Sequence, residues 1–308
     1  MEPKVLVIGN SVTDVIIPLS SLPRKGETVF GDTYTIAGGG KGANQAIALK
    51  RLGCEVTLIS QVGLDNFGAN TIQRYVDEGL SVEHIFVDPD HPTGLAFIMV
   101  DRFANNTITV SPGANLNVGA DRIKKLENLI KNSDILLIHM GIDLPAIIEA
   151  ITIAHHYDTF IILDPAPANK SALDISPYVN ILTPNIVELG TLCDCEINSV
   201  DDAITAAQHI VNKDLITVIV KMDSRGALIV NKSQCNFIPS FKVNAIDATG
   251  AGDAFNAALA LSIYNGQFLD ESVLNANAVG ALAATKLGAQ PSLPYKYDVV
   301  SFLDINQE

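Results

Sequence analysis

Short continuous apolar runs alternate along this chain with longer segments in which apolar residues recur at helical spacing. The apolar runs occupy residues 5–9, 56–60, 135–139, 160–163, 179–182 and 218–220. The helical segments occupy residues 42–52, 71–78, 121–131, 145–156, 200–212, 252–264 and 271–286. An apolar run without polar alternation is typical of a strand buried on both faces. Alternation of such strands with helices predicts an α/β fold in which helices flank a central, mostly parallel sheet.

Two segments depart from this rhythm and predict a small β-sheet lid outside the main sheet. Residues 15–37 combine β-branched residues with Pro18, Pro23 and two glycines, and they show no helical period. Residues 94–101 and 107–111 are two alternating runs joined by Asn105-Asn106, which predicts a hairpin. We expect antiparallel lid strands within residues 12–38 and 93–112, and a single domain over residues 1–308.

Composition narrows the class of protein. The 308 residues carry a formal net charge of −14, which argues against a nucleic-acid partner because phosphate contacts need a basic face. No apolar stretch approaches the ~20 residues of a membrane-spanning helix, and residues 1–9 lack the order of a secretory signal. The four cysteines are scattered, and Cys193-Asp-Cys195 lacks a zinc or redox spacing. These features predict a cytoplasmic protein with reduced thiols and no membrane partner.

The segment from Asp247 to Asp253 carries the strongest chemical signal. Its Gly250-Ala251-Gly252 turn opens a helix, where unpaired N–H groups and the helix dipole suit an anion. Asp253 would lie in the first helical turn beside that anion, in a place suited to accept a proton from a hydroxyl that attacks phosphorus. Taken alone, the same segment is equally consistent with an aspartate that simply favours a helix N-terminus.

Two other segments add candidate binding groups. Gly38-Gly39-Gly40-Lys41 leads into a helix, where the glycines allow close backbone approach and Lys41 and Asn44 offer donors for hydroxyl groups. It is not a Walker A loop, because Gly42 follows Lys41 where that motif has Ser or Thr. Asn185-Ile-Val-Glu188 places an amide and a carboxylate on one helical face, which suits Mg²⁺. Ordinary helix capping is the alternative for this tetrapeptide.

Together these ordered segments resemble the ribokinase-like (PfkB) carbohydrate kinase family, and bacterial ribokinases above all. The glycine-rich segment from Gly38 is similar to the first family signature, and the segment from Asp247 to the second. Asn185 to Glu188 is similar to the family's magnesium motif, and Gly288-Ala-Gln-Pro-Ser292 to the C-terminal segment of ribokinases. The resemblance covers essentially the whole chain and implies an ATP-dependent sugar kinase with a β lid that dimerises through the lids.

The resemblance also implies a role for each matching position. Asp253 would be the general base, and the N–H groups of Gly250, Ala251 and Gly252 would form the anion hole. Sugar hydroxyls would be bound by Asp14, Gly40, Lys41 and Asn44. Nucleotide would be bound by Asn185, Lys221, Asp223, Gly226 and Asn277. Magnesium would be held by Asn185 and Glu188, mainly through water. A monovalent cation, usually K⁺, would be bound by Asp247, Thr249, Ala283, Lys286, Gly288 and Ser292, mostly through carbonyl groups.

The sequence departs from ribokinases at four positions in or near these sites. Val12 stands where ribokinases usually have an asparagine that contacts the sugar, and Gly141 where they have a sugar-contacting glutamate. Losing two buried polar anchors would weaken ribose in its usual pose by about 1–3 kcal/mol each. Lys221 and Asp223 replace the threonine and glycine more usual in the nucleotide loop.

We therefore expect transfer of the γ-phosphoryl group of ATP to a hydroxymethyl group of a pentose-like sugar. A nucleoside or modified-sugar kinase is the alternative that Val12 and Gly141 favour. A dinucleotide-binding enzyme is disfavoured, because Gly9-Asn-Ser-Val follows the first strand instead of a GxGxxG turn. A non-catalytic sugar-binding regulator is disfavoured because binding alone needs no base such as Asp253.

Overall fold

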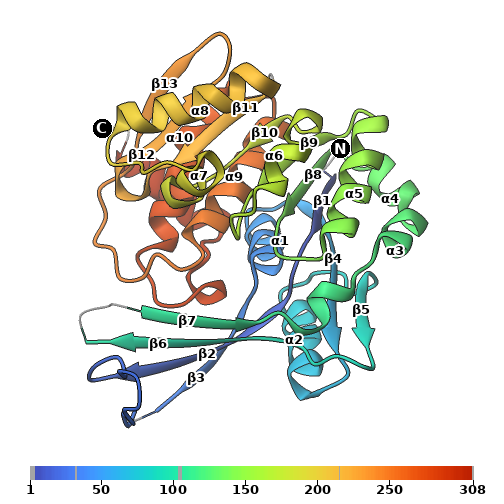
Figure 1. Cartoon of the computed structure of the whole chain (residues 1–308), viewed down its shortest axis with the longest axis vertical. Helices are drawn as coiled ribbons and strands as arrows, with labels where there is room; N and C mark the ends of the chain where they lie inside the picture. Colours follow the sequence, from blue (N-terminus) through green and yellow to red (C-terminus); the bar gives the residue numbers. More distant parts are fainter. Residues whose placement is uncertain (1–3, 32, 103–105, 215, 307–308) are drawn as a thin grey trace.

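A nine-stranded sheet runs through the computed structural model, which describes residues 4–31, 33–102, 106–214 and 216–306 (Figure 1). In spatial order its strands are β13 (Cys235–Pro239), β12 (Gly226–Val230), β11 (Thr217–Lys221), β10 (Ile181–Leu182), β9 (Phe160–Asp164), β8 (Ile135–His139), β1 (Lys4–Ile8), β4 (Glu55–Gly63) and β5 (Ile85–Asp88). All neighbouring pairs from β11 to β5 are parallel, whereas β12 and β13 are antiparallel. The predicted α/β class with a mostly parallel sheet is confirmed.

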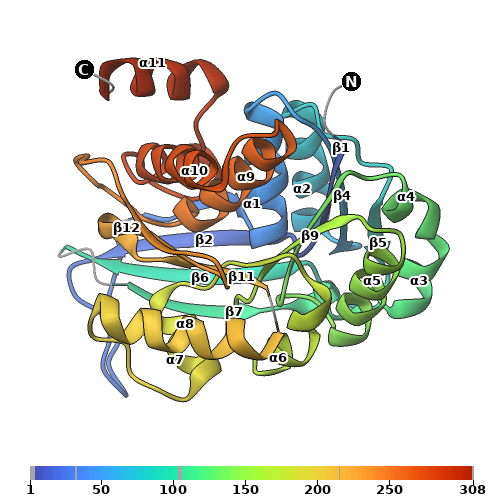
Figure 2. The same cartoon turned by 90° about the horizontal axis from the view of Figure 1, so that it is seen from above.

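Helices cover both faces of this sheet (Figure 2). One face is covered by α1 (Lys41–Arg51), α2 (Asn66–Asp77), α9 (Ala251–Tyr264), α10 (Leu269–Ala283) and α11 (Lys296–Asn306). The other is covered by α3 (Ala120–Lys125), α4 (Glu127–Lys131), α5 (Leu144–His156), α6 (Ser171–Ile175), α7 (Ile186–Cys193) and α8 (Val200–Asp214). Strand β1 shows why its sequence is continuously apolar: Leu6 and Ile8 enter one core layer, and Val5 and Val7 the other.

A second, four-stranded sheet lies beyond the carboxyl end of β1, below the large sheet in the view of Figure 1. Its order is β3 (Thr35–Gly39), β2 (Val12–Leu19), β6 (Gly94–Asp101) and β7 (Asn106–Ser111). These strands lie where the sequence predicts a lid. The prediction that all of them are antiparallel is wrong, because β2 pairs in parallel with β6. Strand β2 follows β1, and β6 follows β5, so each enters the second sheet from a different strand of the main sheet. The two strands then run in the same direction. The predicted turn at Asn105 lies outside the described residues.

Other differences from the sequence-based expectations are local. Residues 121–131 form two helices instead of one, because Leu126 leaves helical geometry at φ −100° and ψ 15°. Strands β5 and β13 were not predicted: β5 has only four residues, and β13 alternates between exposed and half-buried positions. Strand β12 was also missed, although it is wholly buried. Among the described helices, none has the length and apolar character needed to cross a bilayer.

Candidate active site

The first turn of α9 carries the predicted anion site. Gly250 is its N-cap with φ 82° and no side-chain cap, and a Cβ there would lie 3.1 Å from the Ala289 Cα. The Ala251 N–H donates to the Ala248 carbonyl at 3.1 Å. In the described turn, the N–H groups of Gly250 and Gly252 therefore remain as the donors for an anion, and the dipole of this 14-residue helix reinforces them. Of the three predicted donors, Ala251 is the one already occupied.

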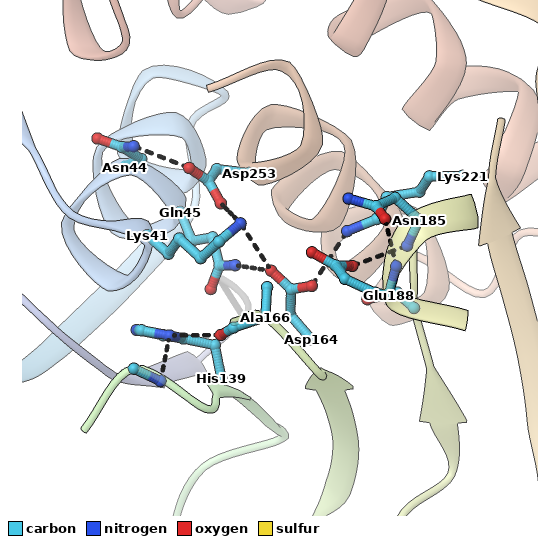
Figure 3. Close-up of polar contacts among 12 residues, drawn as sticks. Lys41, Asn44, Gln45, His139, Asp164, Ala166, Asn185, Glu188, Lys221 and Asp253 are labelled. Atoms are coloured by element: carbon cyan, nitrogen blue, oxygen red, sulfur yellow. Dashed lines mark hydrogen bonds and ion pairs between the residues drawn. The ribbon is translucent and has the colours of Figure 1, made fainter. Parts of the chain in front are cut away.

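Asp253 lies in this turn and is buried, with 4% of its surface exposed. Its Oδ2 accepts a hydrogen bond from Asn44 Nδ2 at 2.8 Å, and Lys41 Nζ lies 3.7 Å from its Oδ1 (Figure 3). Among the described residues, no group makes a hydrogen bond to the buried Oδ1. Burial raises the pKa of Asp253, against the lowering effect of Lys41 and Asn44. One carboxylate oxygen is fixed by a hydrogen bond, and the other accepts none and lies beside the Lys41 ammonium. A general base needs such an oxygen to accept a proton.

Helix α1 brings Lys41 and Asn44 to Asp253. Its N-terminus is capped by a residue that lies outside the helix. Its N-cap Gly40 has φ 91° and no side chain to cap the helix. Instead, Asn10 follows β1, and its side-chain oxygen and carbonyl accept from the N–H groups of Gly42 at 3.2 Å and Ala43 at 3.1 Å. The end of β1 thus fixes the start of α1. Sequence reasoning missed Asn10, although a polar residue directly after a buried strand was a usable signal.

Asp164, at the end of β9, has no exposed surface and lies between two lysines (Figure 3). Its Oδ1 accepts from Lys221 Nζ at 3.1 Å, and its Oδ2 lies 3.6 Å from Lys41 Nζ and accepts from Gln45 Nε2 at 3.3 Å. Burial acts to raise the pKa of Asp164, but Lys221 and Lys41 outweigh it and the pKa is lowered. Asp164 is therefore an ionised carboxylate at the centre of the site. Asp164 was not among the predicted site residues, although its position in a turn after a buried strand, near the expected site, was visible in the sequence.

Asp14, on β2 of the second sheet, is a further buried carboxylate of the site. Burial, together with the charge of Asp253, raises the pKa of Asp14 to about 7, and Arg74 opposes this shift. Gly39 lies directly against it, because a Cβ there would be 2.2 Å from an Asp14 carboxylate oxygen. The predicted sugar-binding residues Asp14, Lys41 and Asn44 are thus gathered around Asp253. Arg74, from α2, was not anticipated.

The two departures at Val12 and Gly141 have structural counterparts. Val12 is buried and packs with Ala96 and Ile98 in an apolar cluster of the second sheet. Gly141 has no room for a side chain, because its Cβ would lie 2.5 Å from the ring of His139. His139 is fully buried, and its Nε2 accepts from the Asn10 N–H at 3.0 Å. Burial lowers the pKa of His139 to about 4, so its imidazole is neutral at pH 7.

The predicted magnesium motif is a complete capping box. Asn185 Oδ1 accepts from the Glu188 N–H, and Glu188 Oε2 accepts from the Asn185 N–H, both at 2.8 Å. The capping explanation of this tetrapeptide is therefore correct as far as it goes. It does not exhaust the motif, since the capping box uses only one of the two oxygens of the buried Glu188. The backbone of Asn185 also pairs with that of Lys221, which links the motif to β11.

The other predicted nucleotide residues lie in different settings. Asp223 has φ 52° in the loop between β11 and β12, which explains why glycine is more usual there. Gly226 has φ 125°, and a Cβ there would meet the Ile238 carbonyl at 2.1 Å. The Asn277 amide donates to the carbonyls of Ile238 and Pro239, so its nitrogen is engaged with β13. A nucleotide contact by Asn277 stays a prediction, and it would have to use the amide oxygen.

The predicted cation segments lie against one another. Asp247 accepts from the Thr249 N–H and hydroxyl through Oδ1 and from the Gly288 N–H through Oδ2. Ser292 is fully buried, with its hydroxyl on the Ala289 carbonyl, and the Lys286 N–H donates to the Ala283 carbonyl. Because the Asp247 carboxylate already accepts three hydrogen bonds, a cation here would rest mainly on carbonyl oxygens. Both the cation and its carbonyl ligands stay predictions.

Comparison with known proteins identifies this arrangement. Residues 2–296 match the model of the pfkB family carbohydrate kinases. The chain is 33% identical to a ribokinase of Haemophilus influenzae over 99% of both proteins, and 30% identical to a deoxyribokinase of Salmonella typhi over 98% of this chain and 99% of that one. The structure of Arabidopsis thaliana ribokinase complexed with ribose and ATP is similar at a TM-score of 0.89 and 25% identity, covering 98% of this chain and 99% of that one. The chain therefore belongs to the pfkB family of carbohydrate kinases and is an ATP-dependent phosphotransferase.

Proposed function

We propose that this kinase transfers the γ-phosphoryl group of ATP to the hydroxymethyl group of a pentose-like sugar, with Asp253 as the general base. One observation carries the proposal: Asp253 Oδ1, which accepts no hydrogen bond from the described residues, lies at the N-terminus of α9, where a phosphoryl group would meet the N–H groups of Gly250 and Gly252. The substrate hydroxyl would donate to Oδ1 and lose its proton there as its oxygen attacks phosphorus. The relatives named for ribokinase and deoxyribokinase activity support a five-carbon acceptor.

The surrounding residues would bind and orient the two substrates. Asp14 and Asn44 offer an acceptor and an amide to sugar hydroxyls, and Lys41 offers a cation beside Asp253. Lys221 lies next to the anion site, since a Cβ at Gly252 would be 3.7 Å from its Nζ. We therefore place the sugar on the Asp14 side of Asp253 and the nucleotide phosphates on the Lys221 side.

The described residues fit a magnesium ion that is bound through phosphate and water. They contain no cluster of three or more His, Cys, Asp or Glu side chains that would form a protein-only metal site. Mg²⁺ in kinases is usually bound by one or two carboxylates together with substrate phosphates. Glu188 and Asn185, next to Lys221, would hold it in this way, and the ion would neutralise charge on the β- and γ-phosphates. K⁺ would bind between the Asp247 and Gly288 segments.

An ADP-release assay with Mg·ATP tests the proposal directly. Ribose, deoxyribose, other pentoses, hexoses and nucleosides would each be offered with and without K⁺. Turnover on ribose would show that His139 or other local groups replace the missing asparagine and glutamate. Turnover only on a deoxypentose or a nucleoside would make Val12 and Gly141 determinants of specificity. Absence of turnover on every acceptor would contradict the proposal and favour a sugar-binding regulator.

A deoxypentose is the alternative acceptor that a specific observation favours. Val12 presents an apolar side chain where a polar anchor would bind a sugar hydroxyl, and the His139 ring fills the place of a side chain at position 141. A pocket built to bind a hydroxyl strongly rejects an analogue that lacks it, whereas an apolar wall does not. The wall formed by Val12 therefore suits an acceptor with one hydroxyl fewer.

We expect sugar use to weaken at acid pH because of Asp14. Its folded-state pKa of about 7 means that the carboxylate gains a proton as the pH falls through that value. A protonated Asp14 is a poorer acceptor for sugar hydroxyls, so kcat/KM for the sugar should fall about tenfold per pH unit below pH 7. Initial-rate profiles from pH 5 to 9 would measure this fall, and an Asp14→Asn variant should lose it. An unchanged acid limb in that variant would refute the assignment.

Stability should move with pH in the opposite direction. The folded state binds the Asp14 proton at about pH 7, and the unfolded chain binds it near 3.8. The stabilisation that comes from the raised pKa of Asp14 is fully present below pH 3.8 and is lost as the pH rises through 7. The Tm of the wild type should therefore fall between pH 5 and pH 8 by more than the Tm of Asp14→Asn.

The second sheet offers a surface for the predicted homodimer. Val15 pairs with both Ile36 and Phe97, so these three side chains share one face. Ile36 is 47% exposed and Phe97 is 43% exposed. We expect Phe97→Lys to convert a dimer into a monomer in sedimentation experiments, while Phe237→Lys, on the outer strand of the main sheet, leaves the dimer intact. Equal sedimentation of both variants and the wild type would contradict this interface.

A further inference from the structure

Four charged side chains form a continuous chain across the site, and we call Asp253, Lys41, Asp164 and Lys221 the charge chain. The Lys41 ammonium lies 3.7 Å from Asp253 Oδ1 and 3.6 Å from Asp164 Oδ2, so two carboxylates share it almost equally. Lys221 Nζ lies 3.1 Å from Asp164 Oδ1 (Figure 3). The chain thus runs from the base on the sugar side to an ammonium on the nucleotide side.

Asp164 is the group in this chain that must remain paired. Its side chain is fully buried, and a buried carboxylate left without a cation is strongly destabilising. Lys221 is its nearer cation, but Lys221 also lies against the first turn of α9. A polyphosphate bound at that turn would compete with Asp164 for the same ammonium. Lys41 is the second cation within reach of Asp164.

We propose that Asp164 couples the two substrate sites. Nucleotide phosphate draws the Lys221 ammonium away from Asp164, and the Lys41 ammonium moves from Asp253 to Asp164 in its place. Asp253 is then free to accept a hydrogen bond from the sugar hydroxyl, so bound nucleotide tightens sugar binding and bound sugar tightens nucleotide binding. This inference rests on the proposed function, and it makes Asp164 a positioning residue that acts through the two lysines.

The other charged groups around the chain do not replace Lys41 or Lys221. Asp253 is faced by Lys41 from α1, Asp14 from β2, and Asp164 and Lys221 from β9 and β11. Asp164 is faced by these two lysines and by His139. His139 is neutral at pH 7 because burial lowers its pKa to about 4, so it supplies no cation in exchange. The two lysines are therefore the only cations that the described geometry offers to Asp164.

Calorimetric titration of the sugar, with and without a non-hydrolysable imido analogue of Mg·ATP, tests this coupling. The sugar would be the acceptor that gives turnover in the ADP-release assay, and the analogue would be kept at ten times its Kd for each variant. We expect the analogue to tighten sugar binding at least fivefold in the wild type, within the usual range for coupled sites. The factor should fall below twofold in Asp164→Asn and in Lys221→Met.

Two further variants separate coupling from damage. Lys170→Met removes an exposed lysine that pairs with Asp194, and it should keep the wild-type factor. The double variant Asp164→Asn/Lys221→Met should show the same tightening factor as each single variant. Each single substitution already breaks the same coupling. Since the factor is a ratio, a general loss of affinity or a lower Tm leaves it unchanged. A wild-type factor in Asp164→Asn or Lys221→Met would overturn the inference, while the proposed function would stand or fall on the ADP-release assay alone.

Discussion

The Asp253→Asn variant should lose about 10²–10⁴-fold in kcat, the usual contribution of a general base. The amide is nearly isosteric, so it can keep a hydrogen bond with Asn44, now at 2.8 Å from the carboxylate. It cannot accept the proton of the substrate hydroxyl. Because Asp253 lies beside the phosphate site without forming it, the Kd of ATP should change by less than about threefold. Coupled ADP-release rates and calorimetric ATP binding would measure the two quantities separately.

A matched control distinguishes the base from a helix-terminal carboxylate. Asp201 lies in the first turn of α8, as Asp253 does in α9, but it is exposed. Asp201→Asn should leave kcat within twofold of the wild type. Near-normal turnover in Asp253→Asn would remove this residue from the role of base. An equal loss in both variants would point to helix electrostatics instead.

Gly42→Ala should destabilise the fold by about 1–3 kcal/mol, although alanine has the higher helix propensity by about 1 kcal/mol. The added Cβ would lie 2.6 Å from the Gly9 Cα and 2.9 Å from the Asn10 nitrogen. These are backbone atoms, so no side chain can rotate away to make room. The end of β1 and the start of α1 must then separate. Urea unfolding followed by far-UV circular dichroism would report the lost free energy of unfolding.

The same substitution should also affect catalysis, since the start of α1 carries Lys41 and Asn44. Lys50→Ala, at an exposed position near the end of α1, is the control and should change stability by less than about 0.5 kcal/mol. If Gly42→Ala were as stable as Lys50→Ala, the close packing of β1 against α1 would be refuted.

The segments of the candidate site were predictable because each is local. The turn at Gly250 and the segment at Gly40 both need backbone conformations that glycine adopts readily, and both glycines have positive φ. The glycine turn that precedes each residue was therefore enough to predict that Asp253 and Lys41 lie at the starts of helices. The capping box of Asn185 and Glu188 was likewise readable from its spacing, which is why structural and functional explanations could not be separated there.

The contacts that join the segments were not predictable in the same way. Asp164 and Lys221 are 57 residues apart, and they meet because β10 alone separates β9 from β11 in the sheet. Strand order is a property of the folded topology, not of any local pattern. The parallel pairing of β2 with β6 was missed for the same reason, since it joins segments about 80 residues apart. Arg74 reached Asp14 only through the packing of α2.

The contact between Gly141 and His139 constrains the order in which this pocket can change. Any side chain at position 141 would have to begin 2.5 Å from the His139 ring, and a Cβ at Gly9 would lie 2.5 Å from the opposite edge of the same ring. A glutamate cannot be placed at position 141 as a single substitution while His139 remains. The histidine must first be replaced by a smaller or differently placed side chain. That step removes the acceptor of the Asn10 N–H, and Asn10 is the residue that caps α1. Positions 139 and 141 are therefore coupled, and a glutamate-lined pocket in this chain requires a substitution at both.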